Sequence, residues 1–102
     1  MGYMRHHAIV VTAFDDRIKD AHDKAISIIG NELVSEIIDS PVNGYRNFFV
    51  CSDGSKEFWS DSDEYEKRRL EFIKWIKDKY WYTWALIQYG DEEGDNTIVE
   101  CS

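Results

Sequence analysis

The stretch His7-Ala8-Ile9-Val10-Val11-Thr12-Ala13-Phe14 decides the fold. From Ala8 onward its residues are apolar or β-branched at odd and even positions alike, so a strand built from it carries apolar side chains on both of its faces. Such a strand is typical of the middle of a sheet rather than its edge. We therefore place residues 7–14 at the centre of a sheet and arrange the rest of the chain around them.

Two segments have the spacing of amphipathic helices. The first follows Asp15 and Asp16, which we expect to cap it, and it ends at Gly30. The second begins in the acidic run of residues 60–64 and ends near Lys79, where cations suit the negative end of the helix dipole. Each has one apolar stripe, which predicts that both helices pack on the same face of the sheet.

Further strands are expected on both sides of two turns. Residues 33–38 and 45–51 flank the turn-forming pair Asn43-Gly44, which predicts a hairpin. Residues 84–89 and 97–101 flank an acidic turn that contains glycine.

The resulting order is strand, helix, strand, strand, helix, strand, strand. It predicts one α+β domain over residues 1–102, a ferredoxin-like split βαβ sandwich (βαββαβ) with an added C-terminal strand. Because crossovers between parallel strands are right-handed, we expect the first strand to contact the first strand of the hairpin in parallel orientation.

Composition excludes several classes of protein. The 102 residues carry 20 Asp and Glu against 12 Lys and Arg, a net charge of −8, which argues against binding of duplex nucleic acid through its phosphates. No apolar run approaches the roughly 20 residues of a membrane helix, and the N-terminal residues lack the apolar core of a secretory signal. We therefore expect a cytoplasmic protein without membrane contact.

The apolar pattern also makes a prediction about assembly. Residues 8–11, 48–50 and 84–87 are apolar at consecutive positions, so the face without helices is apolar too. Monomers seldom expose a large apolar patch. Because symmetric homodimers are the commonest oligomers, we expect a homo-oligomer, a dimer or larger. The alternatives are a partner protein, a flat ligand, or the C-terminal hairpin folded over the sheet.

A basic and aromatic cluster is predicted at one rim of the sheet. Arg5 and His7 share one face of the first strand, and Tyr45 and Arg46 begin a neighbouring strand of the predicted topology. Guanidinium forks match phosphates, and aromatic rings such as that of Trp59 can stack on a base. These five residues are our candidates for binding a nucleotide-like anion. The alternative is a solvated strand end whose arginine pairs with a carboxylate.

Motifs for catalysis, metals or cofactors are missing. The sequence has no Gly-x-Ser-x-Gly elbow, no glycine-rich phosphate loop and no His-x-Thr/Ser pair of the two-histidine phosphoesterases. Its three histidines lack zinc-site spacing. Cys51 and Cys101 form no Cys-x-x-Cys pair, so we expect reduced, partly buried thiols that could pair only if their strands were neighbours. We therefore assign no catalytic residue, no metal and no cofactor.

Three segments resemble those of a family of small bacteriophage and prophage proteins with no assigned activity. They are Met4-Arg5-His6-His7-Ala8-Ile9-Val10-Val11-Thr12, Ser40-Pro41-Val42-Asn43-Gly44-Tyr45-Arg46 and Gln88-Tyr89-Gly90-Asp91. The resemblance runs across nearly the whole chain and includes Arg5, His7, Tyr45 and Arg46. It implies a protein of the host cytosol that counters host immunity, by sequestering a nucleotide signal or by blocking a host defence protein.

Three functions follow from these observations. The first is a phage-type accessory protein, a non-catalytic host-defence antagonist that binds a nucleotide-like signal at a subunit interface. The second is an acidic protein–protein inhibitor or DNA mimic that uses the acidic residues of 52–66 and 91–100. The third is a small phosphodiester hydrolase.

Overall fold

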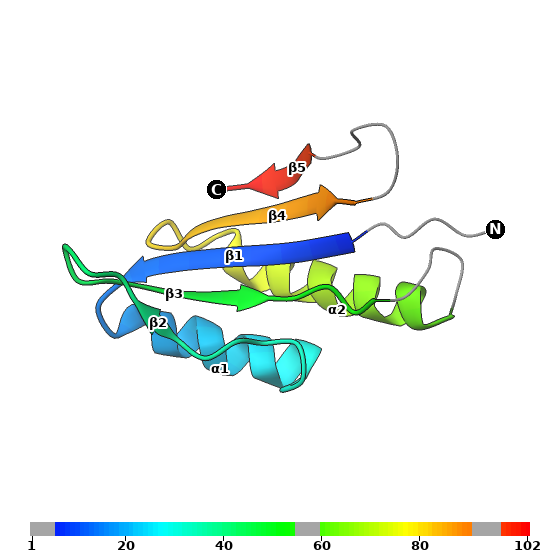
Figure 1. The fold of residues 1–102 in the computed structure, drawn as a ribbon, viewed down its shortest axis with the longest axis horizontal. Coiled ribbons are helices and arrows are strands. Elements are labelled where there is room, and N and C mark those ends of the chain that lie inside the picture. Colours follow the sequence, from blue (N-terminus) through cyan, green and yellow to red (C-terminus); the bar gives the residue numbers. More distant parts are fainter. Residues whose placement is uncertain (1–5, 55–59, 91–96) are drawn as a thin grey trace.

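The architecture is known from a computed structural model that describes residues 6–54, 60–90 and 97–102, without the side chain of Ser62. Five strands form one antiparallel sheet in the order β2-β3-β1-β4-β5, and the two helices pack on one of its faces (Figure 1). The elements are β1 (His6–Phe14), α1 (Arg17–Ile29), β2 (Ile38–Asp39), β3 (Tyr45–Val50), α2 (Ser60–Ile76), β4 (Thr83–Tyr89) and β5 (Thr97–Cys101).

The central position of β1 is confirmed, because it pairs with β3 on one side and with β4 on the other. The α+β class is confirmed as well. The added C-terminal strand is confirmed as β5, which lies beside β4. The order β2-β3-β1-β4-β5 is not the canonical ferredoxin βαββαβ order, and β2 is a two-residue strand at the opposite edge.

The core lies between the helices and one face of the sheet. Alternate residues of each central strand point into it, as the period of two in a strand requires. The helices contribute one stripe each. The fully buried residues with the largest side chains are Phe48, Phe72, Ile9, Ile18, Ile29, Ile76, Val11 and Val50.

The predicted strand over residues 33–38 is mostly wrong. Within it, Val34 forms one isolated bridge to Val50, and regular pairing is limited to β2 at its end. The Ser35 side chain explains the interruption. The backbone N–H of Phe49 donates to Ser35 Oγ at 2.8 Å, where a regular ladder would supply a backbone carbonyl.

The predicted parallel contact between the first strand and the hairpin is wrong, because β3 lies between β1 and β2. β3 runs antiparallel to β1 and pairs Tyr45 with Phe14 and Val50 with Ile9. The beginning of β3 therefore lies beside the end of β1, not beside its beginning.

The helix ends differ in part from expectation. Gly30 ends α1 at a φ of 114°, as predicted. Asp16 stands at the N-cap position but makes no side-chain cap hydrogen bond, and its carboxylate lies 3.5 Å from Lys19 Nζ instead. α2 ends at Ile76, and Lys79 Nζ donates to the carbonyl of Trp75 at 2.6 Å. Neither of these two described helices has the length and apolar character needed to cross a membrane.

Candidate functional site

The predicted ligand-binding residues are not brought together as one site. Arg5 and Trp59 lie outside the described residues. His7 lies near the beginning of β1, whereas Arg46 pairs with Ala13 near its end. At about 3.3 Å per residue, the six steps between His7 and Ala13 correspond to roughly 20 Å. The predicted rim cluster is therefore wrong, because it relied on a parallel pairing that the chain does not have.

Tyr45 and Arg46 also point to opposite faces of the sheet. Arg46 lies on the helix side, where its Nε donates to Asp39 Oδ1 at 2.6 Å and its Nη1 lies 3.6 Å from Asp16 Oδ1. Tyr45 lies on the other face, edge-on to Phe14 with ring centres 5.7 Å apart. The contacts of Arg46 thus match the alternative of an arginine paired with carboxylates. These ion pairs join β2 and β3 to the start of α1.

The first candidate surface is the sheet face opposite the helices, which we call the open face. Strand alternation and pairing place fifteen described residues on it, and none is Asp, Glu, Lys or Arg. With 31% charged residues in the chain, fifteen positions would hold about five by composition alone. The residues are His6, Ala8, Val10, Thr12, Phe14, Ile38, Tyr45, Asn47, Phe49, Thr83, Ala85, Ile87, Tyr89, Ile98 and Cys101.

Large apolar side chains on the open face remain in contact with solvent. The exposed fractions are 53% for Phe14, 40% for Phe49 and 60% for Ile98. Polar groups in the middle of the face are already paired. Thr12 Oγ1 donates to Asn47 Oδ1 at 2.6 Å, and Asn47 Nδ2 donates to Ser40 Oγ at 2.8 Å. This part of the face can therefore lose its water without losing hydrogen bonds.

The C-terminal strand does not cover the open face. β5 pairs edge to edge with β4, and the N–H of Ser102 donates to the carbonyl of Trp84 at 3.0 Å. The alternative in which the C-terminal hairpin folds over the sheet is therefore wrong for residues 97–102. Cys51 and Cys101 are exposed rather than partly buried. They are free thiols. Cys51 follows the end of β3 and Cys101 ends β5, and β1 and β4 lie between these two strands.

The second candidate is a cavity on the helix side, at the end of the sheet where β1 begins. Arg69 of α2, which the sequence analysis missed, lies in its wall and is only 5% exposed. His7 also lines it, with its Nε2 3.2 Å from Gln88 Oε1. The cavity has a volume of about 70 Å³ and is lined by His7, Glu66, Arg69, Leu70, Leu86 and Val99.

The electrostatics of this cavity are set by one buried cation and two acids. Burial lowers the pKa of Arg69, and the charges of Asp53 and Glu66 act in the opposite direction. Asp53 Oδ1 lies 3.8 Å from Arg69 Nη1, and the Asp53 side chain is itself only 9% exposed. A sequence signal existed: Arg69 sits four residues after Tyr65 and three before Phe72, in the apolar stripe of α2.

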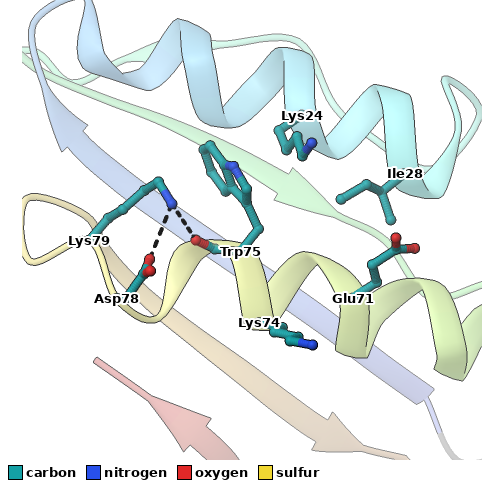
Figure 2. Close-up of a pocket in the computed structure, with 7 residues that line it drawn as sticks. All are labelled: Lys24, Ile28, Glu71, Lys74, Trp75, Asp78 and Lys79. Atoms are coloured by element: carbon teal, nitrogen blue, oxygen red, sulfur yellow. Dashed lines mark hydrogen bonds and ion pairs between the residues drawn. The ribbon is translucent and has the colours of Figure 1, made fainter.

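A third feature is the groove between the two helices, of about 330 Å³ (Figure 2). Ile28 of α1 and Trp75 of α2 point into it, and Lys24, Glu71 and Lys74 also line it. Lys79 Nζ lies 4.3 Å from the centre of the Trp75 ring and also contacts Asp78 Oδ1 at 3.1 Å. The ammonium group of Lys79 also donates a hydrogen bond to a carbonyl in the last turn of α2. Because the donors of Lys79 already have partners, we interpret the groove as structural.

No protein-family model, curated protein or solved structure matches this chain. Within the described ranges, no three side chains of the types His, Cys, Asp and Glu are grouped so that they could hold a metal ion. The functional argument therefore starts from the open face.

Proposed function

We propose that this chain is a non-catalytic binding protein that acts as a homodimer, with the open faces of two sheets packed against each other. The observation that supports it best is the lack of Asp, Glu, Lys and Arg at the fifteen described positions of that face, on a chain of net charge −8. A charge-free surface can be buried without the desolvation cost of ionised groups. It is also complementary to itself, as the interface of a two-fold dimer must be.

The size of the open face fits a small specific interface. Five strands about 4.8 Å apart span about 19 Å, and β1 with nine residues is about 30 Å long. Allowing for the shorter outer strands, the flat area is roughly 500 Å² per copy, or about 1,000 Å² for two, before side-chain relief is added. Specific interfaces generally exceed about 1,000 Å² in total. A second copy therefore offers enough apolar surface to hold the pair together.

A second copy is favoured over an unrelated partner by charge. Two copies that meet at their open faces keep the acidic residues of each chain outside the contact, where salt screens them over about 8 Å. A partner that used the acidic surface instead would leave Phe14, Phe49 and Ile98 exposed.

The proposal also includes two more specific interpretations from the sequence, one of the fold and one of the ligand and its role. We interpret the sheet as ferredoxin-like with an added strand, because β3 lies between β1 and β2, as in a split βαβ unit. We also retain a nucleotide-like signal as the ligand and antagonism of host defence as the role. The resemblance to phage proteins supports this role, and Arg46 is no longer part of the ligand site.

Two variants test the dimer. Phe49→Glu places a charge on the open face at a partly exposed position, whereas Tyr80→Glu places the same charge where the side chain is 93% exposed. We expect Phe49→Glu to elute from size-exclusion chromatography as a monomer and to remain folded by circular dichroism, because the buried charge has no partner in the dimer. Tyr80→Glu should elute with the wild type. Equal elution of all three proteins as monomers, or as dimers, would exclude the open face as the interface.

A further inference from the structure

The open face carries one group whose charge changes near neutral pH. Of the fifteen described residues of this face, His6 is the histidine, and histidine is the side chain that gains or loses its proton between pH 5 and 8. Tyrosine and cysteine, the other titratable side-chain types of the face, ionise in water at more alkaline pH. The open face is therefore free of charge only while His6 is neutral.

Among the described residues, the groups that face His6 include no carboxylate. His6 begins β1 beside β4, where the centre of its ring lies 5.4 Å from that of Tyr89 (Figure 1). Ala8 is the next residue of β1 on this face, and β3 ends at Val50, opposite Ile9, before it reaches His6. In a dimer the partner presents the same fifteen residues, which include no Asp or Glu. A proton on His6 thus gains no ion pair from these residues when the dimer closes.

The hydrogen bonding of the ring also favours its neutral form in a closed dimer. His6 Nδ1 is buried and has no hydrogen-bond partner. A neutral imidazole leaves one nitrogen without a hydrogen, whereas a protonated imidazole carries an N–H group on both nitrogens. In a monomer the half-buried ring can turn its charge toward water. In a dimer the second sheet, about 10 Å away, excludes that water, so the charge and its N–H donors lose their solvation.

A contact large enough to be specific includes the end of the face at which His6 lies. The flat area of the open face, roughly 500 Å² per copy, only reaches the total of about 1,000 Å² that specific interfaces generally exceed. A stable pair of chains therefore needs the whole length of β1, which begins with His6.

We propose that pH regulates the dimer and that protonation of His6 opens it. The inference rests on the proposed dimer and adds its regulation. Because the closed dimer keeps His6 neutral, it binds fewer protons than two separate monomers. The dimer is therefore stable above the pH at which His6 of the monomer titrates, and it is lost as the pH falls through that range. The effect enters twice, since each copy contributes one His6.

The net charge of the chain predicts the opposite direction. Each of the three histidines adds one positive charge when it is protonated, which takes the net charge of a chain from −8 to −5. Two less acidic copies repel each other less, so a dimer limited by overall repulsion would become tighter in acid. Weaker association in acid therefore distinguishes a charge on the contact surface from the charge of the whole chain.

Sedimentation equilibrium of the wild-type protein at pH 7.5 and pH 5.5, at one fixed ionic strength, tests the inference. We expect the dissociation constant of the dimer to be at least tenfold higher at pH 5.5. A dimer that is equally tight or tighter at pH 5.5 would overturn the regulation by pH and leave the open-face dimer intact. A monomer at both pH values would overturn the dimer, and the regulation with it.

Two single variants locate the effect. His6→Gln is polar and neutral at both pH values, so its dissociation constant should no longer depend on pH. His7→Gln is the matched control, because His7 lies on the helix side, with its Nε2 3.2 Å from Gln88 Oε1, and this variant should keep the tenfold change. Circular dichroism at both pH values checks that each variant is folded. A pH dependence that persists in His6→Gln, or that disappears in His7→Gln, would overturn the assignment to His6.

Discussion

Tyr82 is a buried phenol that joins the end of one helix to the beginning of the other. It is 2% exposed, and its hydroxyl donates to the carbonyl of Arg17 at 2.8 Å. Burial raises the pKa of Tyr82. In the unfolded chain a tyrosine ionises near pH 10, so the folded protein keeps this proton to higher pH. The stability that this proton contributes is complete below pH 10 and is lost as pH rises toward the folded pKa.

Replacement of Tyr82 by phenylalanine tests this account of one residue. At pH 7 we expect Tyr82→Phe to lower the free energy of unfolding by about 1 kcal/mol, because the Arg17 carbonyl loses its donor. Above pH 10 the gap between wild type and variant should narrow, since only the wild type has this phenol to ionise. Urea unfolding at pH 7, 9 and 10.5 measures both effects. A gap that is constant with pH would show that Tyr82 ionises alike in both states.

At the scale of elements, the local patterns predicted more than the long-range pairings. The period of β1, the Asn43-Gly44 turn and the span of β5 are confirmed, because each depends on neighbouring residues. The strand expected over residues 33–38 was wrong because a serine side chain replaces part of the ladder. The rim site was wrong because strand direction depends on the whole topology, which local periodicity does not contain.

Local sequence patterns also predicted the roles of polar residues poorly, because a pattern does not show which distant residues a side chain contacts. Arg46 is a candidate in the sequence because it begins a strand expected beside Arg5 and His7 and because its guanidinium matches a phosphate, yet in the structure it pairs with Asp39 and Asp16. Arg69 was passed over because it stands among apolar residues of a helix, and that position is the reason it is buried. The open face was predicted correctly as an apolar surface, since strand alternation is enough to identify it. What covers that face stays a prediction.

The turn between β2 and β3 gives a test at the element scale. Gly44 has a φ of 69°, and a Cβ atom added there would lie 3.3 Å from Cε2 of Phe14. Gly54, at a φ of 78° with open space around it, is the matched control. Both Gly→Ala variants incur the positive-φ strain of about 1 kcal/mol. We expect Gly44→Ala to lose more stability in urea unfolding, because the Phe14 ring must also shift. Equal losses of stability in the two variants would mean that the Phe14 ring shifts without a cost in free energy.

At the scale of the whole molecule, the acidic surface and the neutral open face have opposite effects on the association of two copies. The net charge of −8 on each copy repels the other, whereas apolar burial attracts. Salt screens the repulsion and leaves the apolar term largely intact. A dimer closed over the open face should therefore dissociate more readily at low ionic strength than at 0.5 M salt. A contact made by ion pairs would weaken with salt instead.

The mass of the wild-type protein in solution tests the central claim most directly. Sedimentation equilibrium from micromolar to millimolar concentration, at low and at high salt, reports whether two chains associate. The account predicts a species of 24 kDa, twice the 12.0 kDa of one chain, that is favoured by salt. A particle that stays at 12.0 kDa up to the highest concentration would contradict it.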